Sequence, residues 1–161
     1  MKKLIVSTTL APLLIIALAG TTLAAPAKAE KKELPFKGTL QSVETYVVAP
    51  PIMSVTANGS GNATHLGQYA ISYEVEVNLE TLAGVGSAQL VAANGDMLYA
   101  NLSGQATPAG EPDVFNVVEE FTITGGTGRF ANASGSFTLH REVNITTGVT
   151  SGTMNGTMIL P

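Results

Sequence analysis

Two charged residues occupy an otherwise apolar stripe in the C-terminal third of the chain. Between residues 114 and 145, Glu119 and Arg141 share the parity of the apolar positions. We expect the two segments here to be neighbouring strands joined by a loop centred on Phe130, so that the numbers of paired residues sum to 260. Glu119 then faces Arg141. The remaining inward pairs are all apolar: Phe115 with Ile145, Val117 with Val143, Phe121 with Leu139, and Ile123 with Phe137.

The Glu119–Arg141 pair has two interpretations. Either charge alone would be costly on a buried stripe, whereas the two together roughly compensate each other. The pair could therefore be a buried ion pair that fixes strand register. Inside a barrel, the same pair could orient a ligand or polarise a substrate. Both interpretations stay open, and Glu119 and Arg141 are candidate ligand-binding residues.

His65 is the third candidate. It has the parity of Tyr69 and Ile71, which predicts that its ring points toward the apolar side of a strand beginning near Ala63. We expect a core histidine with satisfied hydrogen bonds, and the alternative is a group at the mouth of a cavity. On the outer face, the 260 register places Glu120 opposite His140, which we interpret as a solvated surface pair.

Nothing in the sequence predicts a cofactor, a metal site or a catalytic residue. Residues 126–131 match the letters of a dinucleotide-binding fingerprint, but a strand follows them in place of the helix that would receive a pyrophosphate. His65 and His140 are far apart in the sequence and the chain has no cysteine, so no zinc-site spacing exists. No serine lies on a nucleophile-elbow pattern.

The elements that must position these residues are strands. From Gln68 to Glu80, apolar and polar residues alternate with a period of two, as in a long half-buried strand. Asn94-Gly95 predicts a type I′ hairpin turn. The other predicted strands cover residues 38–48, 52–57, 88–92, 97–102, 114–124, 136–145 and 153–160. We therefore predict an all-β domain, an eight-stranded antiparallel β-barrel whose closure leaves no exposed edge.

The N-terminal residues predict export from the cytoplasm. Lys2 and Lys3, an apolar segment and the sequence Ala27-Lys28-Ala29 are typical of a helical signal peptide, residues 1–29, with cleavage after Ala24 as the alternative. Residues 30–37 are expected to form a flexible leader, and residues 38–161 the barrel domain. The protein is thus expected to be secreted or periplasmic.

The charge of the predicted domain is strongly acidic. Beyond Gly38 there are two arginines and no lysine, against ten carboxylates. Such a domain would repel phosphate backbones and anionic membrane surfaces, so we expect no nucleic-acid partner and no membrane association after signal cleavage.

Residues 124–135, TGGTGRFANASG, resemble the glycine-rich segment of plant dirigent proteins and the corresponding loop of allene oxide cyclases. Residues 63–69 and 92–98 resemble a broad group of uncharacterised secreted bacterial proteins with an allene-oxide-cyclase-like barrel. The resemblance implies an eight-stranded barrel whose interior binds an apolar substrate and which associates as a homo-oligomer. This chain departs from the plant families in having few aromatic residues, and we transfer no catalytic residue to it.

Three functions compete at this point. The first is a non-catalytic barrel that holds a small apolar ligand. The second is an isomerase or cyclase acting on a lipid-derived substrate, which predicts a cavity of roughly 300 Å³ or more with Glu119 and Arg141 at its wall. The third is a protein-interaction module, which predicts an exposed apolar patch on the outer wall.

Overall fold

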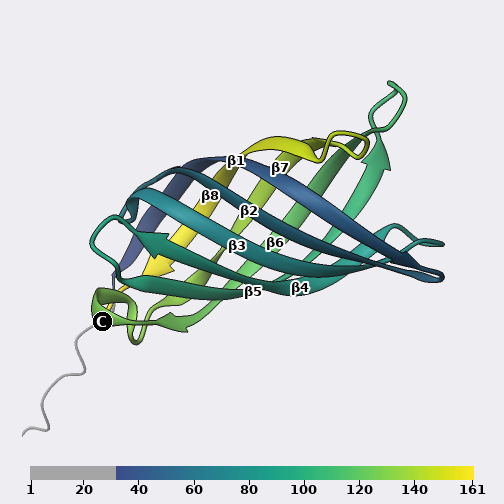
Figure 1. Cartoon of the computed structure of the whole chain (residues 1–161). Helices are drawn as coiled ribbons and strands as arrows, with labels where there is room; N and C mark the ends of the chain where they lie inside the picture. Colours follow the sequence, from purple (N-terminus) through teal and green to yellow (C-terminus); the bar gives the residue numbers. More distant parts are fainter. Residues whose placement is uncertain (1–31) are drawn as a thin grey trace, which may run out of the picture.

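The computed structural model describes residues 32–161, which form a closed antiparallel barrel of eight strands (Figure 1). The strands are β1 (Glu33–Ala49), β2 (Ile52–Ala63), β3 (Gly67–Asn78), β4 (Ala83–Ala92), β5 (Met97–Pro108), β6 (Val114–Gly126), β7 (Ser134–Asn144) and β8 (Val149–Ile159). One turn of 3₁₀ helix, η1 (Gly128–Phe130), lies between β6 and β7. The predicted fold class is confirmed, and the predicted signal peptide lies outside the described residues.

Each strand pairs with its neighbours in the sequence, and β1 pairs with β8 to close the barrel. The period-two pattern produces this arrangement because alternate side chains fill the interior while the intervening ones face water. In β3, for example, Tyr69, Ile71, Tyr73 and Val75 are buried and the residues between them are exposed. Within the described residues, no helix has the length and apolar character needed to cross a membrane.

The interior is filled with aromatic side chains toward the end at which the C-terminus lies (Figure 1). Phe137 stacks on Phe121, with ring centroids 4.6 Å apart, and makes a tilted contact with Phe36 at 4.8 Å. Phe130, carried by η1, is fully buried. This half of the barrel is a packed core that leaves little room for a ligand.

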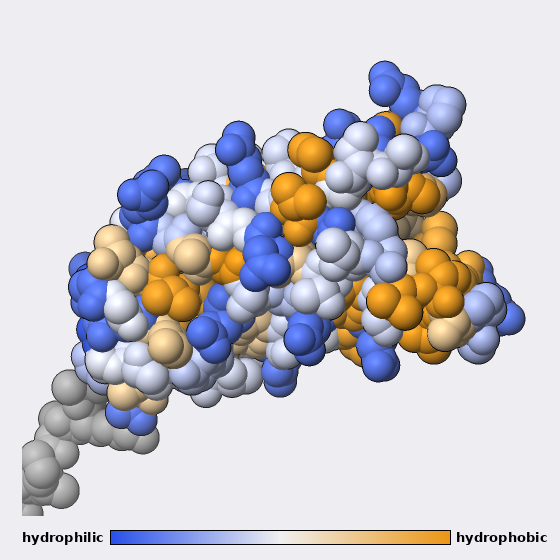
Figure 2. Space-filling model, in the orientation of Figure 1, coloured by the Kyte–Doolittle hydropathy of each residue, from blue (hydrophilic) through white to orange (hydrophobic). Residues whose placement is uncertain are grey.

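The opposite end carries hydrophobic surface (Figure 2, right-hand side). Val47 and Val48, next to the β1–β2 turn, are 69% and 59% exposed. Met53, Leu79 and Leu82 lie beside the turns at this end and are only partly buried. We call this end of the barrel, formed by the β1–β2, β3–β4, β5–β6 and β7–β8 connections, the mouth.

The first strand begins earlier than the sequence predicts. Residues 33–37, expected to be part of a flexible leader, belong to β1 and pair with the end of β8, Glu33 opposite Ile159. The physical reason is Phe36, which is fully buried against Phe137 and therefore ties this segment to the core.

The β4–β5 hairpin is also different from its prediction. Gly95 has a positive φ of 88° but Asn94 does not, so the connection is not a two-residue type I′ turn. The Gly95 amide donates to the Ala92 carbonyl at 2.8 Å. The Asn94 side chain is engaged with Asp96, because its Nδ2 donates to Asp96 Oδ2 at 2.8 Å and its Oδ1 accepts from the Asp96 amide at 3.2 Å.

Candidate ligand-binding site at the barrel mouth

The β6–β7 register differs by two residues from the predicted one. Glu119 lies opposite Leu139, and Arg141 lies opposite Val117, so the numbers of paired residues sum to 258. The connection is not a symmetric turn, because η1 folds over the end of the barrel to bury Phe130. A shift of two residues keeps every side chain on its predicted face, whereas a shift of one would have reversed them all.

Glu119 and Arg141 nevertheless form an ion pair inside the barrel. As diagonal neighbours on β6 and β7 they are within reach of each other's long side chains. Arg141 Nε donates to Glu119 Oε2 at 2.8 Å, and Nη2 donates to Oε1 at 3.0 Å, which makes the contact bidentate. Their side chains are only 5% and 4% exposed. The expected association of these two residues is confirmed, although not as directly opposed partners.

A second carboxylate, not among the candidates predicted from the sequence, completes the cluster. Arg141 Nη1 donates to Glu44 Oε1 at 2.5 Å and also to Thr150 Oγ1 at 3.4 Å. The Glu44 side chain is 3% exposed. Glu44 lies on β1 with the parity of the buried Leu40 and Ser42, and this alternation was the signal that could have placed it inside.

Two tyrosines hold Glu44 in place from the other side. The Tyr73 hydroxyl donates to Glu44 Oε1 at 2.7 Å and lies 3.1 Å from Ser42 Oγ. The Tyr46 hydroxyl donates to Glu44 Oε2 at 3.0 Å. The Tyr73 ring also lies 5.7 Å from Arg141 Cζ, a cation–π contact. Within residues 32–161, no buried side-chain nitrogen or oxygen lacks a hydrogen-bond partner.

These surroundings shift several pKa values. Burial raises the pKa of the Tyr73 hydroxyl, with Arg141 opposing and Glu44 adding to the shift. Burial likewise raises the pKa of Tyr46, and Glu44 raises it further. Burial by itself would lower the pKa of Arg141, but its hydrogen bonds to Glu119 and the nearby negative charge raise it overall. Both tyrosines are therefore neutral donors and Arg141 a permanent cation at neutral pH.

The cluster forms the floor of a cavity that opens at the mouth. The cavity has a volume of about 160 Å³, and its polar lining includes Glu44, Tyr46, Glu119 and Arg141. Most of its walls are apolar side chains: Met53, Val55, Val75, Val77, Leu79, Leu82, Phe115, Val117, Val143 and Ile145. An apolar enclosure with a few convergent polar groups is the usual form of a small-molecule site.

Two facing glycines make room for this arrangement. Gly84 on β4 pairs with Gly104 on β5, and both line the cavity. A Cβ at residue 104 would lie 2.5 Å from Glu119 Cγ, so only glycine lets the Glu119 side chain lie against this wall. A Cβ at residue 84 would lie 2.9 Å from Val75 Cγ1.

His65 is not part of this site. It lies in the β2–β3 turn with φ of 67°, is only partly buried, and its Nε2 is 3.2 Å from the Pro35 carbonyl oxygen. The prediction of a core histidine was wrong because β2 continues to Ala63, so the turn breaks the alternation and the neighbouring Leu66 is buried instead. Glu120 and His140 are not paired either, since Glu120 lies opposite Thr138 and its Oε2 accepts from the Thr138 hydroxyl.

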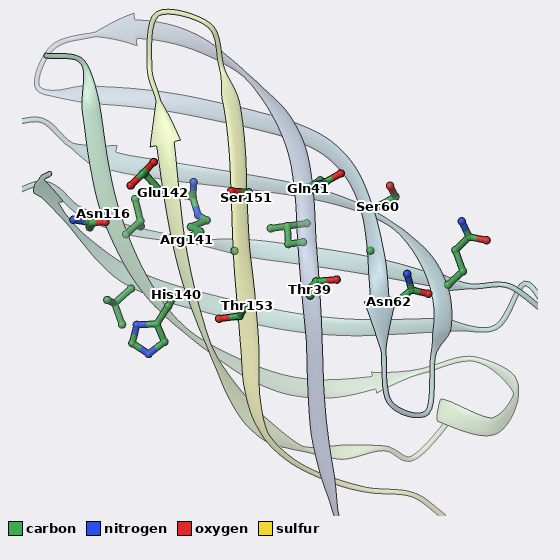
Figure 3. A pocket seen from close by; sticks show the side chains of 16 residues that line it. Thr39, Gln41, Ser60, Asn62, Asn116, His140, Arg141, Glu142, Ser151 and Thr153 are labelled. Carbon is green, nitrogen blue, oxygen red and sulfur yellow. The ribbon is translucent and has the colours of Figure 1, made fainter. Parts of the chain in front are cut away.

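A larger hollow lies on the outer wall (Figure 3). This groove, about 800 Å³, crosses β2, β1, β8, β7 and β6, and its polar lining includes Thr39, Gln41, Ser60, His140 and Ser151. It is open to solvent along its length, and its hydrogen-bonding groups remain accessible to water. The enclosed cavity at the mouth is therefore the stronger candidate for a specific ligand.

Comparisons with known proteins show the fold. No family model matches this chain, and no curated protein matches it by sequence. Among solved structures, it is similar to the pterocarpan synthase dirigent protein GePTS1, with a TM-score of 0.61 and 15% identity over 89% of this chain and 99% of that one. It is also similar to the pterocarpan synthase dirigent protein PsPTS1, with a TM-score of 0.61 and 14% identity over 83% and 98% of the two chains. The chain has a dirigent-like barrel fold.

Proposed function

We propose that this barrel binds a small, mainly apolar molecule in the cavity at its mouth. The observation that supports the proposal is the cavity itself, an apolar enclosure above a fully hydrogen-bonded polar floor. Burial of the ligand's apolar surface would supply the affinity, at about 25 cal/mol per Å². The polar floor would fix the orientation of the bound molecule.

The size of the cavity limits the ligand. Typical sites for drug-sized molecules have volumes of about 300–1,000 Å³, whereas this cavity has about 160 Å³. A molecule with a single medium-length aliphatic chain fits this volume better than a polycyclic compound. A longer ligand would project from the mouth past the exposed Val47 and Val48.

A catalytic role, as an isomerase or cyclase acting on a lipid-derived substrate, is the second candidate. It is favoured by the position of Glu119 and Arg141 at the cavity wall, and the two similar structures are named as synthases. Two observations rank it lower. The cavity is smaller than the roughly 300 Å³ that this role predicts, and Arg141 already contacts two carboxylates. Unchanged turnover by Glu119→Gln in a substrate screen would exclude Glu119 as a catalyst.

The third candidate is a protein-interaction module. Its support is a set of exposed valines on the outer wall, of which Val43 and Val149 are paired across β1 and β8. The outer groove beside them is polar. We therefore rank this role last.

The sequence also supports a proposal for where the protein acts. We propose that residues 1–29 are removed on export and that the barrel works in the periplasm or outside the cell, like the secreted bacterial proteins it resembles. We also propose that the barrel associates as a homo-oligomer, as the resemblance to the plant families implies.

The test is saturable binding of octan-1-ol, a small molecule with a single aliphatic chain, to the purified protein, measured by isothermal titration calorimetry. Ala106 lines the cavity, and Ala106→Phe should fill the mouth and weaken binding at least tenfold. The matched control is Ala70→Phe, which adds the same ring to an exposed position on β3 and should bind like wild type. Equal binding by all three proteins would overturn the proposal.

A further inference from the structure

The floor of the cavity contains more negative than positive charge. Glu44 and Glu119 are both in contact with the same guanidinium, that of Arg141, which leaves the cluster with a formal charge of −1. Arg129 is the next arginine, and it lies elsewhere, on η1 beside Asp96, with its side chain 47% exposed. The two arginines are the only cations beyond Gly38. Among the described residues, the ion pairs of Glu44 and Glu119 are both made to Arg141, so no second cation pairs with this cluster.

The two carboxylates are not equivalent. Both oxygens of Glu119 accept from Arg141 in the bidentate pair. In Glu44, Oε1 accepts from Arg141 and from Tyr73, whereas Oε2 accepts only from the Tyr46 hydroxyl. Glu44 Oε2 therefore differs from the two Glu119 oxygens because its one donor is a neutral hydroxyl and not the guanidinium. A carboxylate oxygen has two lone pairs, so Glu44 Oε2 can accept a further hydrogen bond.

The donor to Glu44 Oε2 is the hydroxyl of Tyr46, a residue that lines the ligand cavity. Tyr46 and Glu44 both line the cavity, and Tyr46 is only partly buried, so its ring borders the mouth. Glu44, Tyr46 and Arg141 all line the cavity, so a ligand's head group can approach Glu44 Oε2 beside the Tyr46 hydroxyl. The Arg141 donors that face the cluster are already committed to Glu119, Glu44 and Thr150.

We infer that the ligand has a proton-donating, preferentially cationic head group, such as a primary amine at the end of an aliphatic chain, and that this group binds at Glu44 Oε2. This inference rests on the proposed binding function and names the class of ligand for the same cavity. A cationic head would bring the cluster to neutrality and supply a charge-assisted hydrogen bond. A carboxylate head would add a third negative charge to a site with little access to water and no unpaired cation.

Three ligands that differ only in the head group test the inference: octan-1-ol, octylamine and octanoate, each titrated into the protein at pH 7 by isothermal titration calorimetry. At this pH the amine is positively charged and the carboxylic acid is ionised. We expect octylamine to bind at least tenfold more tightly than octanoate, with octan-1-ol between them. Glu44→Gln should bring the amine and the alcohol to within about threefold of each other, because it removes the excess charge while keeping the shape of the side chain.

Glu74→Gln is the matched control, because it removes one carboxylate from the exposed face of β3 and should leave the ranking unchanged. Octanoate binding as tightly as octylamine to the wild-type protein would overturn the inference, while binding of octan-1-ol would still support the ligand-binding function. Failure of all three ligands to bind would instead refute the proposed function and the inference together. The wild-type ranking decides the question even if Glu44→Gln does not fold.

Discussion

At the scale of single residues, the central contact is between Arg141 and its two carboxylates. All three side chains are at most 5% exposed, and together they lie between the aromatic core and the mouth cavity. Buried ions of this kind are costly to remove from water, and the cost is offset only while each has its partner. The stability of the barrel therefore depends on the Arg141 guanidinium, whether or not a ligand is bound.

Arg141→Leu should destabilise the protein by about 3–5 kcal/mol, because it leaves Glu44 and Glu119 buried beside each other without a cation. Urea unfolding followed by circular dichroism measures the change in unfolding free energy. Arg129→Leu is the control, since Arg129 is half-exposed and its nitrogen lies 3.9 Å from Asp96, so it should change stability by less than about 1 kcal/mol. Equal effects of the two substitutions would contradict a buried cluster.

At the scale of elements, the register of β6 and β7 determines which side chains meet. Val118 lies opposite His140 on the outer wall, whereas the register expected from the sequence would have placed Glu120 there. Directly opposed residues in an antiparallel pair have Cα atoms about 4.5–5.5 Å apart. This spacing falls within the range that a disulfide can bridge.

The chain contains no cysteine, so introduced pairs report on register without interference. We expect Val118→Cys with His140→Cys to form a disulfide on mild oxidation. Glu120→Cys with His140→Cys should remain reduced, because diagonal neighbours are about 7–8 Å apart. Mass spectrometry of the oxidised proteins distinguishes the outcomes. Preferential cross-linking of Glu120→Cys with His140→Cys would instead support the register in which the numbers of paired residues sum to 260.

Much of the strand arrangement could be predicted from the sequence. The period-two alternation identifies the strands and places Glu119 and Arg141 on the inner face. A register shift of two residues leaves that alternation unchanged, so parity cannot detect it. The alternation that buries Leu40 and Ser42 would also have placed Glu44 inside the barrel. The position of His65 was predicted wrongly because parity holds only within a strand, and β2 ends at Ala63. The volume of the cavity depends on how the side chains around Gly84 and Gly104 pack, which no pattern in the sequence encodes.

At the scale of the whole molecule, buried tyrosines link stability to pH. Burial raises the pKa of Tyr69, as it does those of Tyr46 and Tyr73, above the usual value of about 10. In the unfolded chain these hydroxyls ionise near pH 10, while in the barrel they keep their protons to higher pH. The stability they contribute is therefore fully present below about pH 10 and is lost as the pH rises further.

We expect the appearance of tyrosinate absorbance above about pH 10 to coincide with the loss of the β-sheet circular dichroism signal. Three of the four tyrosines would ionise only as the barrel opens. Ionisation of all four near pH 10 in a barrel with an unchanged spectrum would show that these hydroxyls are not buried.

The whole molecule is also divided along its axis, with a filled aromatic half at one end and a cavity at the other. Its methionines mark the two halves: Met53 lines the cavity, whereas Met154 and Met158 are buried in the core cluster. The most direct test is therefore a titration of methyl-¹³C-methionine-labelled protein with octan-1-ol, followed by NMR. We expect a saturable shift of the Met53 methyl signal, while the signals of Met154 and Met158 stay in place. Shifts of Met154 and Met158 with an unchanged Met53 signal would contradict a binding site at the mouth.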